Sequence, residues 1–218
     1  MEPCCGPTEP GPYDAIFDSR FSGALARRYG RKGLRHPELR IVEFLAATGI
    51  EGASVLEIGG GVGEIQLELL KRGAARAVNL ELSAGYEKDA TRLAEAAGLE
   101  SRIDRRLGVD LAAAPDDVEP ADVVVLHRVV CCYPDYAALL GAAADHARRA
   151  LVFSYPPANP LSRVFIRGMN AMLNASGRSF RGYIHPPKAM VEVLRSRGLE
   201  PAYRWHGPVW HLVGATRG

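Results

Sequence analysis

The sequence lacks the features that identify secreted, membrane-spanning and zinc-finger proteins. Its 218 residues contain no long apolar run typical of a membrane span or a signal peptide. The four cysteines form two vicinal pairs, Cys4–Cys5 and Cys131–Cys132, and neither pair makes a Cys-x-x-Cys zinc motif. We therefore expect a protein of the reducing cytoplasm, with no metal site and no membrane partner.

An excess of charge of one sign is also missing, because 27 basic and 25 acidic side chains leave a net charge of +2. This charge is too small to imply a polyanionic partner, so we expect no binding to nucleic acid. With 47% hydrophobic and 24% charged residues, the composition is that of an ordinary globular domain. These numbers leave the oligomeric state open.

The pattern of apolar residues divides the chain into three parts. Residues 1–13 are rich in proline and glycine and predict a flexible tail. Residues 14–49 predict a helical cap that contains two amphipathic helices, over 15–29 and 37–48. Residues 50–218 form the main domain.

In the main domain, strands alternate with helices, which predicts a parallel sheet with right-handed crossovers. The expected strands are 53–58, 76–81, 102–107, 121–126 and 150–155, and the expected helices are 63–72, 84–97 and 135–148. Two further strands, 199–206 and 208–216, finish the chain and are joined tightly at Gly207-Pro208.

The most informative segment is the run SVLEIGGGVGE at 54–64. A buried strand ends there, Gly59, Gly61 and Gly63 allow a sharp turn, and a helix begins directly afterwards. Such a turn places unpaired helix amides and the positive end of the helix dipole beside a bound ligand. The dinucleotide pattern Gly-x-Gly-x-x-Gly does not fit, because the windows that start at Gly59 and Gly61 end on Glu and Gln.

The run follows instead the pattern acid-x-Gly-x-Gly-x-Gly, in which Glu57 is the acid. It resembles the first motif of class I S-adenosylmethionine-dependent methyltransferases. The resemblance implies S-adenosylmethionine as the cofactor. It also implies a Rossmann-like α/β fold, with a seven-stranded, mostly parallel sheet, an antiparallel C-terminal hairpin and helices on both faces.

Two acids further along the chain complete the expected nucleoside pocket. Glu81 ends the second strand, where a carboxylate accepts hydrogen bonds from both ribose hydroxyls; an ordinary solvated acid is the alternative. Asp110 resembles the acid of the family that binds the adenine amino group, with Leu111 packed on the ring; alternatively, Asp110 caps the following loop. The full set of expected cofactor-binding residues is Glu57, Gly59, Gly60, Gly61, Gly63, Glu81, Leu82, Asp110, Leu111 and His127.

The acceptor side is expected after the fourth strand, where the chain reads HRVVCCYP at 127–134. Methyltransferases that alkylate planar amines usually carry Asn/Asp-Pro-Pro-Tyr/Phe there, and this chain does not. The resemblance therefore favours a small-molecule acceptor, methylated on oxygen, carbon or sulfur by in-line displacement. His127 is the first candidate base and His185 the second, while Tyr29 and Tyr133 are candidates to orient the substrate or to contact the sulfonium.

Three local features resemble magnesium-protoporphyrin O-methyltransferases and related small-molecule enzymes. They are Tyr29-x-x-x-Gly33, the glycine run and Tyr133-Pro134. In that family a histidine precedes the Tyr-Pro pair and is a candidate acid or base. Cys132 stands at this position here, and this departure moves the search for a base to other residues.

An insertion at about 157–185 does not belong to the minimal fold of the class. Its segment 160–174 predicts a helix, and four side chains, Leu161, Phe165, Met169 and Met172, give that helix one apolar face. The face either packs into the core or forms a lid over the substrate.

Three other functions remain open on the sequence alone. A non-catalytic protein that binds an S-adenosyl ligand would keep the nucleoside pocket. The vicinal thiols of Cys131 and Cys132, with Cys4 and Cys5 folding over them, are soft ligands that suit a metal or an arsenical as the methyl acceptor. A Rossmann oxidoreductase would bind NAD and would not respond to S-adenosylmethionine.

Overall fold

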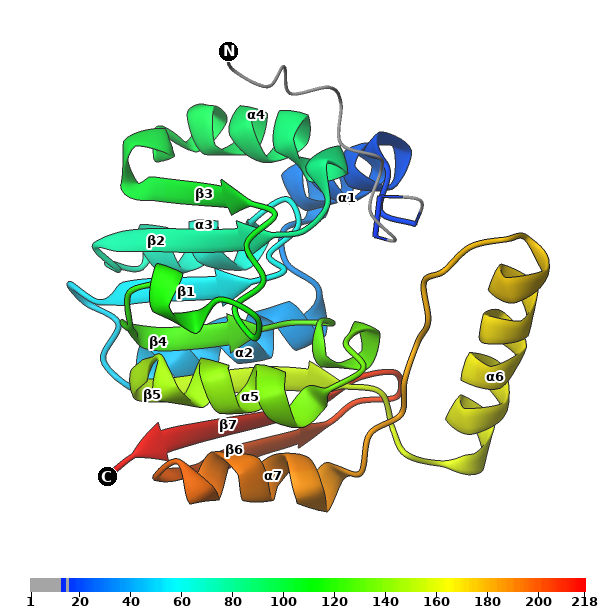
Figure 1. Ribbon diagram of the computed structural model, residues 1–218. Helices are drawn as coiled ribbons and strands as arrows, with labels where there is room; N and C mark the ends of the chain where they lie inside the picture. Colours follow the sequence, from blue (N-terminus) through cyan, green and yellow to red (C-terminus); the bar gives the residue numbers. More distant parts are fainter. Residues whose placement is uncertain (1–12, 15) are drawn as a thin grey trace, which may run out of the picture.

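Seven strands form one mixed sheet in the computed structural model, which describes residues 13, 14 and 16–218 (Figure 1). Nearly all of the tail predicted at 1–13 therefore lies outside the described residues. The strands stand in the order β3-β2-β1-β4-β5-β7-β6, which confirms the predicted fold class. Their bounds are β1 Ser54–Ile58, β2 Arg76–Glu81, β3 Ile103–Leu107, β4 Ala121–Leu126, β5 Ala147–Tyr155, β6 Leu199–His206 and β7 His211–Arg217.

Every strand except β7 runs in the same direction. β1 pairs in parallel with β2 and with β4, whereas β7 lies antiparallel between β5 and β6. The chain moves outward from β1 to β3 and then returns to place β4 on the other side of β1. At this switch point the connections after β1 and β4 diverge at the carboxyl ends of the strands, which is where doubly wound sheets bind ligands.

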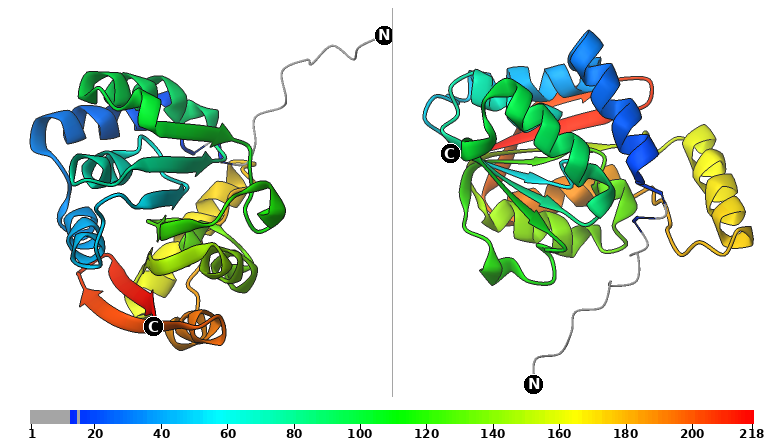
Figure 2. Two further views of the ribbon diagram at one scale, coloured as in Figure 1. Left: turned by 90° about the vertical axis from the view of Figure 1, so that its left-hand side faces the viewer. Right: turned by 90° about the horizontal axis from the view of Figure 1, so that it is seen from above.

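Helices cover both faces of the sheet (Figure 2). Buried side chains of α1, α2, α3 and α4 share one hydrophobic cluster with the sheet, and those of α5 and α7 share the other. The helix α6 contributes to neither cluster and stands beside the carboxyl edge of the sheet. The helices are α1 Ser19–Lys32, α2 His36–Ala47, α3 Glu64–Lys71, α4 Glu87–Ala97, α5 Tyr136–Asp145, α6 Pro160–Ala175 and α7 Pro187–Ser196. Four short 3₁₀ helices lie at Ala84–Tyr86, Glu100–Arg102, Pro115–Asp117 and Val130–Cys132.

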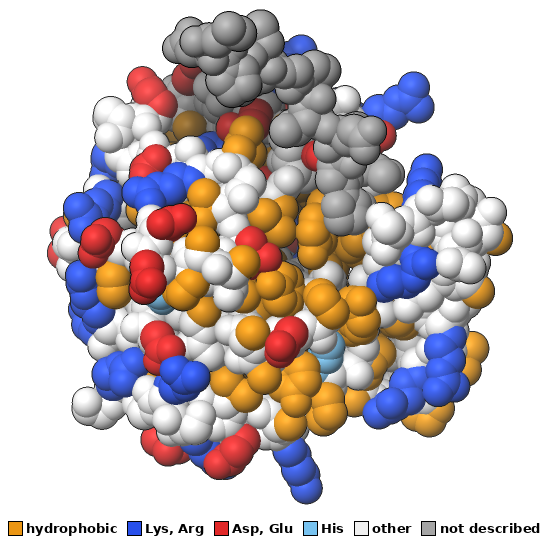
Figure 3. All heavy atoms as spheres, in the orientation of Figure 1, with side chains coloured by type: hydrophobic (Ala, Val, Ile, Leu, Met, Phe, Trp, Pro, Cys, Tyr) orange, Lys and Arg blue, Asp and Glu red, His pale blue; other side chains and the backbone are white. Residues whose placement is uncertain are grey.

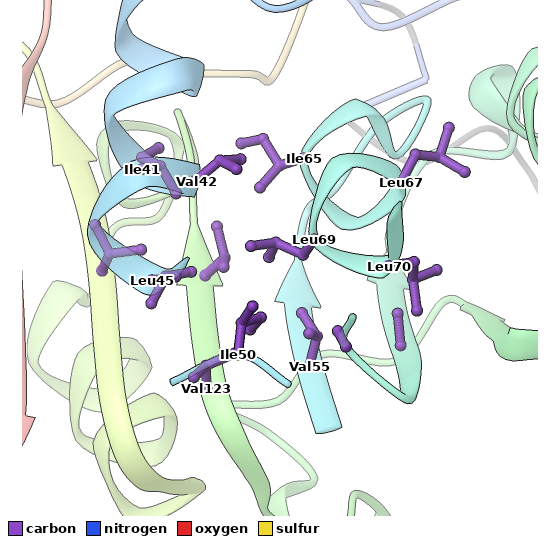
Figure 4. Close-up of a cluster of buried hydrophobic side chains, with 14 of the residues drawn as sticks. Ile41, Val42, Leu45, Ile50, Val55, Ile65, Leu67, Leu69, Leu70 and Val123 are labelled. Atoms are coloured by element: carbon purple, nitrogen blue, oxygen red, sulfur yellow. The ribbon is translucent and has the colours of Figure 1, made fainter. Parts of the chain in front are cut away.

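Alternation along the strands builds the two cores. Val55 of β1 belongs to the cluster under α2 and α3, whereas its neighbour Leu56 belongs to the cluster under α5 and α7. Figure 4 shows Ile41 of α2 and Ile65 of α3 gathered with Val55 and Val123 of the sheet. Because both faces are packed in this way, the strand ends, and the loops that follow them, are held in place.

Several element ends differ from the prediction by a few residues, and three of the differences have a clear physical reason. α1 begins at Ser19, four residues later than predicted, because the Asp18 carboxylate caps it by accepting hydrogen bonds from two amides of its first turn. β5 begins earlier, at Ala147, because it pairs with β4 across a bulge. β7 begins at His211, because the turn after β6 is longer than the predicted Gly207-Pro208 pair.

Gly60 is a position at which the fold requires the absence of a side chain. A Cβ there would collide with the buried amide of Asn79 and would lie 2.9 Å from Cδ of Glu57. We therefore expect Gly60→Ala to lower the free energy of unfolding by about 1–3 kcal/mol.

The matched control is Gly30→Ala in the exposed face of α1, where a Cβ meets nothing within 4 Å. This variant is expected to gain about 0.5–1 kcal/mol from helix propensity. Denaturant unfolding of both variants checks the prediction, and a Gly60→Ala protein as stable as the parent would contradict it.

Candidate functional site

A glycine turn joins β1 to α3 at the switch point of the sheet. Gly59, Gly61 and Gly63 have φ angles of 61°, 56° and 81°, which residues with a Cβ rarely adopt. The Gly59 amide donates to the carbonyl of Leu80 at 2.7 Å and ties the turn to β2. A Cβ on Gly59 would lie 2.6 Å from Cγ2 of Val129, so the turn also passes close to the loop after β4.

Glu57 supports this turn from the end of β1. Its Oε2 accepts a hydrogen bond from the Gln66 amide at 3.2 Å, which satisfies one of the free amides at the start of α3. Gln66 in turn accepts from the side-chain amide of Asn79 at 3.0 Å. Burial, together with the nearby Glu64 carboxylate, raises the pKa of Glu57 well above its usual range. Glu57 thus holds the start of α3 in position beneath the ligand-binding turn.

Glu81 links the tip of β2 to the glycine turn. Its Oε2 accepts from the Gly61 amide at 2.9 Å, and its Oε1 accepts from the amides of Leu82 and Ser83 at 2.8 and 3.0 Å. Burial raises the pKa of this carboxyl group above its usual value. An ionised carboxylate can accept about four hydrogen bonds. The three hydrogen bonds from backbone amides therefore leave one acceptor position for a ligand hydroxyl. Glu81 is therefore a buried strand-end acid, and the solvated alternative does not apply.

Asp110 follows β3 and faces the same space. Its Oδ1 accepts from the Ala112 amide at 3.0 Å, so it does cap the following loop. Its Oδ2 accepts from the hydroxyl of Tyr133 at 2.9 Å. Burial and the hydrogen bond to Asp110 raise the pKa of Tyr133 to about 12. The Asp110–Tyr133 pair thus closes the space between the loops after β3 and β4.

These loops enclose one pocket that contains most of the predicted site. Of the predicted residues, those that line it are Glu57, Gly59, Gly60, Gly61, Glu81, Leu82, Asp110, Leu111, His127 and Tyr133. The loops after four neighbouring parallel strands therefore meet where the sheet reverses its order.

Three predicted site residues lie outside this lining. Gly63 forms the N-cap of α3 and serves the turn instead. The hydroxyl of Tyr29 donates to Oε1 of Glu68 at 2.6 Å, and the ring packs in the core under α1. The Nε2 atom of His185 lies 3.1 and 3.0 Å from the carbonyls of Val130 and Tyr133, so its contacts hold the loop after β4.

His127 does line the pocket, and its side chain is only 8% exposed. Neither ring nitrogen has a hydrogen-bond partner among the described residues, and Nε2 lies 3.7 Å from Oε1 of Glu38. Burial lowers the pKa of this imidazole below its usual value, although Glu38 acts in the opposite direction. The neutral imidazole is therefore favoured at neutral pH, and a neutral ring can accept a proton.

Arg128 is a site residue that the sequence did not single out. It is the one residue other than glycine with a positive φ, 63°, in the described part of the chain. Its guanidinium donates to Glu38 at 3.1 Å and lies 5.5 Å from the ring centroid of Trp210, while its backbone amide donates to Oγ of Ser154 at 2.7 Å. A backbone conformation held by so many contacts is typical of functional sites.

An aromatic cluster closes the pocket from the N-terminal side. Tyr13, Phe17 and Phe21 line the pocket, together with Tyr86 that follows β2. The ring of Phe17 lies 5.6 Å from that of Phe180, which belongs to the segment after α6. The spacing of four residues between the first three aromatics is a signal in the sequence that would have placed them on one side of the segment.

Glu64, the first residue of α3, is a buried carboxyl group in the pocket lining that sequence reasoning also missed. Burial raises its pKa to about 7, and the carboxylate of Glu38 contributes in the same direction, while Arg128 opposes both. A carboxyl group with this pKa changes charge near neutral pH.

The two described cysteines are neighbours, and one of them contacts the same pocket. The Sγ atoms of Cys131 and Cys132 are 3.7 Å apart, and Cys132 lines the pocket. The hydrogen bond between the thiols lowers the pKa of Cys131 and raises that of Cys132. Among the described residues, no group of three or more His, Cys, Asp or Glu side chains is placed to hold a metal, and Cys4 and Cys5 lie outside this part of the chain.

The sheet with its reversed β7, the glycine turn after β1 and the carboxylate at the tip of β2 define the class of Rossmann-like methyltransferase folds. The chain belongs to the methyltransferase domain family, whose model matches residues 27–202. This membership confirms the predicted methyltransferase and, with it, S-adenosylmethionine as the cofactor of the class. No curated protein matches the chain by sequence.

Solved structures with the same fold include several methyltransferases. A magnesium protoporphyrin IX methyltransferase from Synechocystis is 19% identical, with a TM-score of 0.73 over 94% of this chain and 98% of that one. An O-methyltransferase family 2 protein from Planctomyces limnophilus, in complex with apigenin, is 18% identical, with a TM-score of 0.66 over 94% of this chain and 63% of that one. A putative sarcosine dimethylglycine methyltransferase from Galdieria sulphuraria is 13% identical, with a TM-score of 0.65 over 92% and 98%. At these identities the likeness establishes the fold.

The raised pKa of Glu64 predicts a specific pH dependence of stability. In the unfolded chain Glu64 loses its proton near pH 4.5, but in the folded protein it does so only near pH 7. The parent therefore loses stability relative to Glu64→Gln as the pH rises from about 4.5 to 7, and the difference stays constant above that range. The full shift corresponds to a difference on the order of 3 kcal/mol. Urea unfolding of both proteins from pH 4 to 8 measures it, and a difference that does not change with pH would refute the assignment.

Proposed function

We propose that the chain transfers the methyl group of S-adenosylmethionine to a small-molecule acceptor, with oxygen as the favoured accepting atom. The observation that carries this proposal is the single lining shared by the glycine turn, Glu81 and Asp110 on one side and by aromatic side chains and His127 on the other. A cofactor held by the first group would have its reactive end directed toward the second. Carbon and sulfur acceptors fit the same arrangement, and a planar nucleobase amine is disfavoured by the missing Pro-Pro motif.

The residues present fit the cofactor of the family. The backbone of the glycine turn approaches the pocket without a side chain, and a Cβ on Gly61 would sit 3.4 Å from the ring of Tyr86 and narrow the space. Glu81 has acceptor capacity for ribose hydroxyls, and Leu82 and Leu111 supply apolar contacts of the kind that a purine ring requires. When bound, S-adenosylmethionine supplies a methyl group that is already activated by the sulfonium. The task of the protein is then mainly to position the acceptor, which is worth an effective molarity of about 10⁵–10⁸ M.

The acceptor side supports an apolar or aromatic small molecule. Phe17, Phe21, Cys132 and Leu139 face the pocket there, and polar groups are few. Among the structural neighbours, one is described as a magnesium protoporphyrin IX methyltransferase and another was solved with apigenin. Protoporphyrin IX and apigenin are both flat ring systems, which suits a pocket that is lined by an aromatic cluster.

His127 is the proposed general base for a hydroxyl acceptor. It lies in the pocket, its pKa is lowered so that the neutral form is favoured at neutral pH, and both ring nitrogens are free of hydrogen bonds among the described residues. Glu38, 3.7 Å away, is placed to stabilise the imidazolium that forms when the hydroxyl proton is taken up. A positioned base contributes typically about 10²–10⁴-fold to the rate, which is less than positioning contributes.

The ribose role of Glu81 is tested by Glu81→Ala. Loss of hydrogen bonds to a charged acceptor costs about 1.5–3 kcal/mol, so we expect the Kd for S-adenosylmethionine to rise about 10- to 150-fold while turnover at saturation changes little. Isothermal titration calorimetry measures the Kd, and Glu95→Ala, an exposed acid of α4, is the control. Because Glu81 also accepts from Gly61, circular dichroism must show that the variant is folded. An unchanged Kd in folded protein would remove the ribose assignment.

The base is tested by comparing His127→Asn with His185→Asn in transfer of a labelled methyl group to a panel of hydroxylated aromatic acceptors. We expect His127→Asn to lower kcat by about 10²–10⁴-fold with an unchanged Kd for the cofactor, and His185→Asn to keep kcat within about threefold. The reverse result would assign the base to His185. Tight cofactor binding by the parent without transfer to any acceptor would favour the non-catalytic alternative.

A further inference from the structure

The outward face of α6 is apolar and exposed to solvent. Four of its side chains, Leu161, Val164, Phe165 and Met172, are 78%, 66%, 67% and 66% exposed. They are four of the seven large hydrophobic side chains that are exposed in the described part of the chain. Their spacing of three, one and seven residues places them on one side of the helix. Of the predicted apolar face, Leu161, Phe165 and Met172 are thus exposed and do not pack into the core, whereas Met169 is half-buried and lies toward Gly182 of the segment after the helix.

The inward side of α6 contacts little besides the segment that follows it. Nδ2 of Asn170 donates to the carbonyl of Gly182 at 2.9 Å, and the Gly182 amide donates back to Oδ1 of Asn170 at 2.8 Å. Leu173 is the one buried residue of the helix. The return segment is itself fixed to the domain, because the Tyr183 amide donates to the carbonyl of Cys131 at 2.7 Å. One side of the helix is thus joined to the segment that follows it. On its other side no helix or strand covers α6, as Figures 1 and 2 show.

Positive charge lies on the other, polar side of α6 and just beyond the end of the helix. Arg163 and Arg167 lie on α6, and Arg178 and Arg181 follow it. No aspartate or glutamate occurs from residue 146 to residue 191. On the face seen in Figure 3, the lobe that contains α6 accordingly displays basic and hydrophobic side chains.

We propose that α6 is an interfacial helix, which lies in the headgroup region of an anionic lipid bilayer with its apolar face toward the acyl chains. An amphipathic helix with exposed Leu, Phe and Met on one side and arginines on its polar side has the composition that binds such surfaces. At 16 residues, with two arginines, it is not a span, and no described helix is long and apolar enough to cross a bilayer. The prediction of no membrane partner rests on the missing transmembrane segment. A helix that lies on the surface of a bilayer does not require such a segment.

A second copy of the chain is the less favourable occupant of this face. Two copies that pack through α6 would bring two sets of four arginines together, and the segment 146–191 offers no carboxylate to offset them. Anionic headgroups carry the complementary charge, worth about 1 kcal/mol for each arginine near the surface, which is about a fivefold change in affinity. The charge pattern therefore selects lipid over self-association.

The test is flotation of the full chain with vesicles, which needs no methyl acceptor and so does not depend on the proposed function. We expect binding to phosphatidylcholine vesicles that contain phosphatidylserine, weaker binding to phosphatidylcholine alone, and release at high salt. Leu161→Ser/Phe165→Ser should weaken binding at least tenfold, because two anchors of the apolar face are lost. Arg163→Gln/Arg167→Gln should weaken it about 25-fold, from a fivefold change for each arginine.

The matched control is Val209→Ser, which removes another hydrophobic side chain, 62% exposed, from the turn between β6 and β7. Its affinity for the vesicles should equal that of the parent. Absence of the parent from the vesicle fraction, or equal binding to neutral and anionic vesicles, would overturn the proposal. So would a parent that sediments as a dimer and becomes a monomer in Leu161→Ser/Phe165→Ser, since a second copy would then cover the face.

Discussion

The site depends on one hydrogen bond, from the Gly61 amide to Oε2 of Glu81 at 2.9 Å. It joins the turn after β1 to the tip of β2, two segments that lie side by side only because the sheet places these strands next to each other. The Gly61 amide fixes one oxygen of Glu81, and the amides of Leu82 and Ser83 fix the other. Because the backbone makes these contacts, the cradle is rigid before any ligand arrives, and little conformational entropy is lost on binding.

The same geometry concentrates buried carboxyl groups around the pocket. Burial is the largest effect and raises the pKa values of Glu57, Glu64 and Glu81. Arg105 opposes it at Glu57 and Glu81, and Arg128 opposes it at Glu64. Burying these carboxyl groups together costs electrostatic free energy, and a positive charge placed near them would favour their ionised forms.

Sequence reasoning succeeded where a contact is encoded locally. The glycine turn and Glu81 follow buried strands directly, so their position at the carboxyl edge could be predicted from strand order alone. It does not give positions that depend on packing between distant segments. The sequence predicts His185 as the second candidate base, but the structure places it outside the pocket lining, with its Nε2 near two backbone carbonyls. The contact of Phe17 with Phe180 joins segments more than 160 residues apart, and no local pattern encodes it.

The two sides of the pocket are built from different parts of the chain. The cofactor half is built from backbone amides and strand ends, which tolerate few substitutions because a Cβ at Gly59 or Gly60 collides with its neighbours. The aromatic side of the pocket, where we propose that the acceptor binds, is built from side chains instead. Tyr13 and Phe17, which precede α1, contact Phe180 of the segment after α6 rather than the sheet. Phe180 thus links the segment after α6 to Phe17 in the pocket lining, without a contact to the glycine turn in between. Acceptor choice and any surface on which α6 rests can consequently vary while the chemistry supplied by the cofactor stays the same.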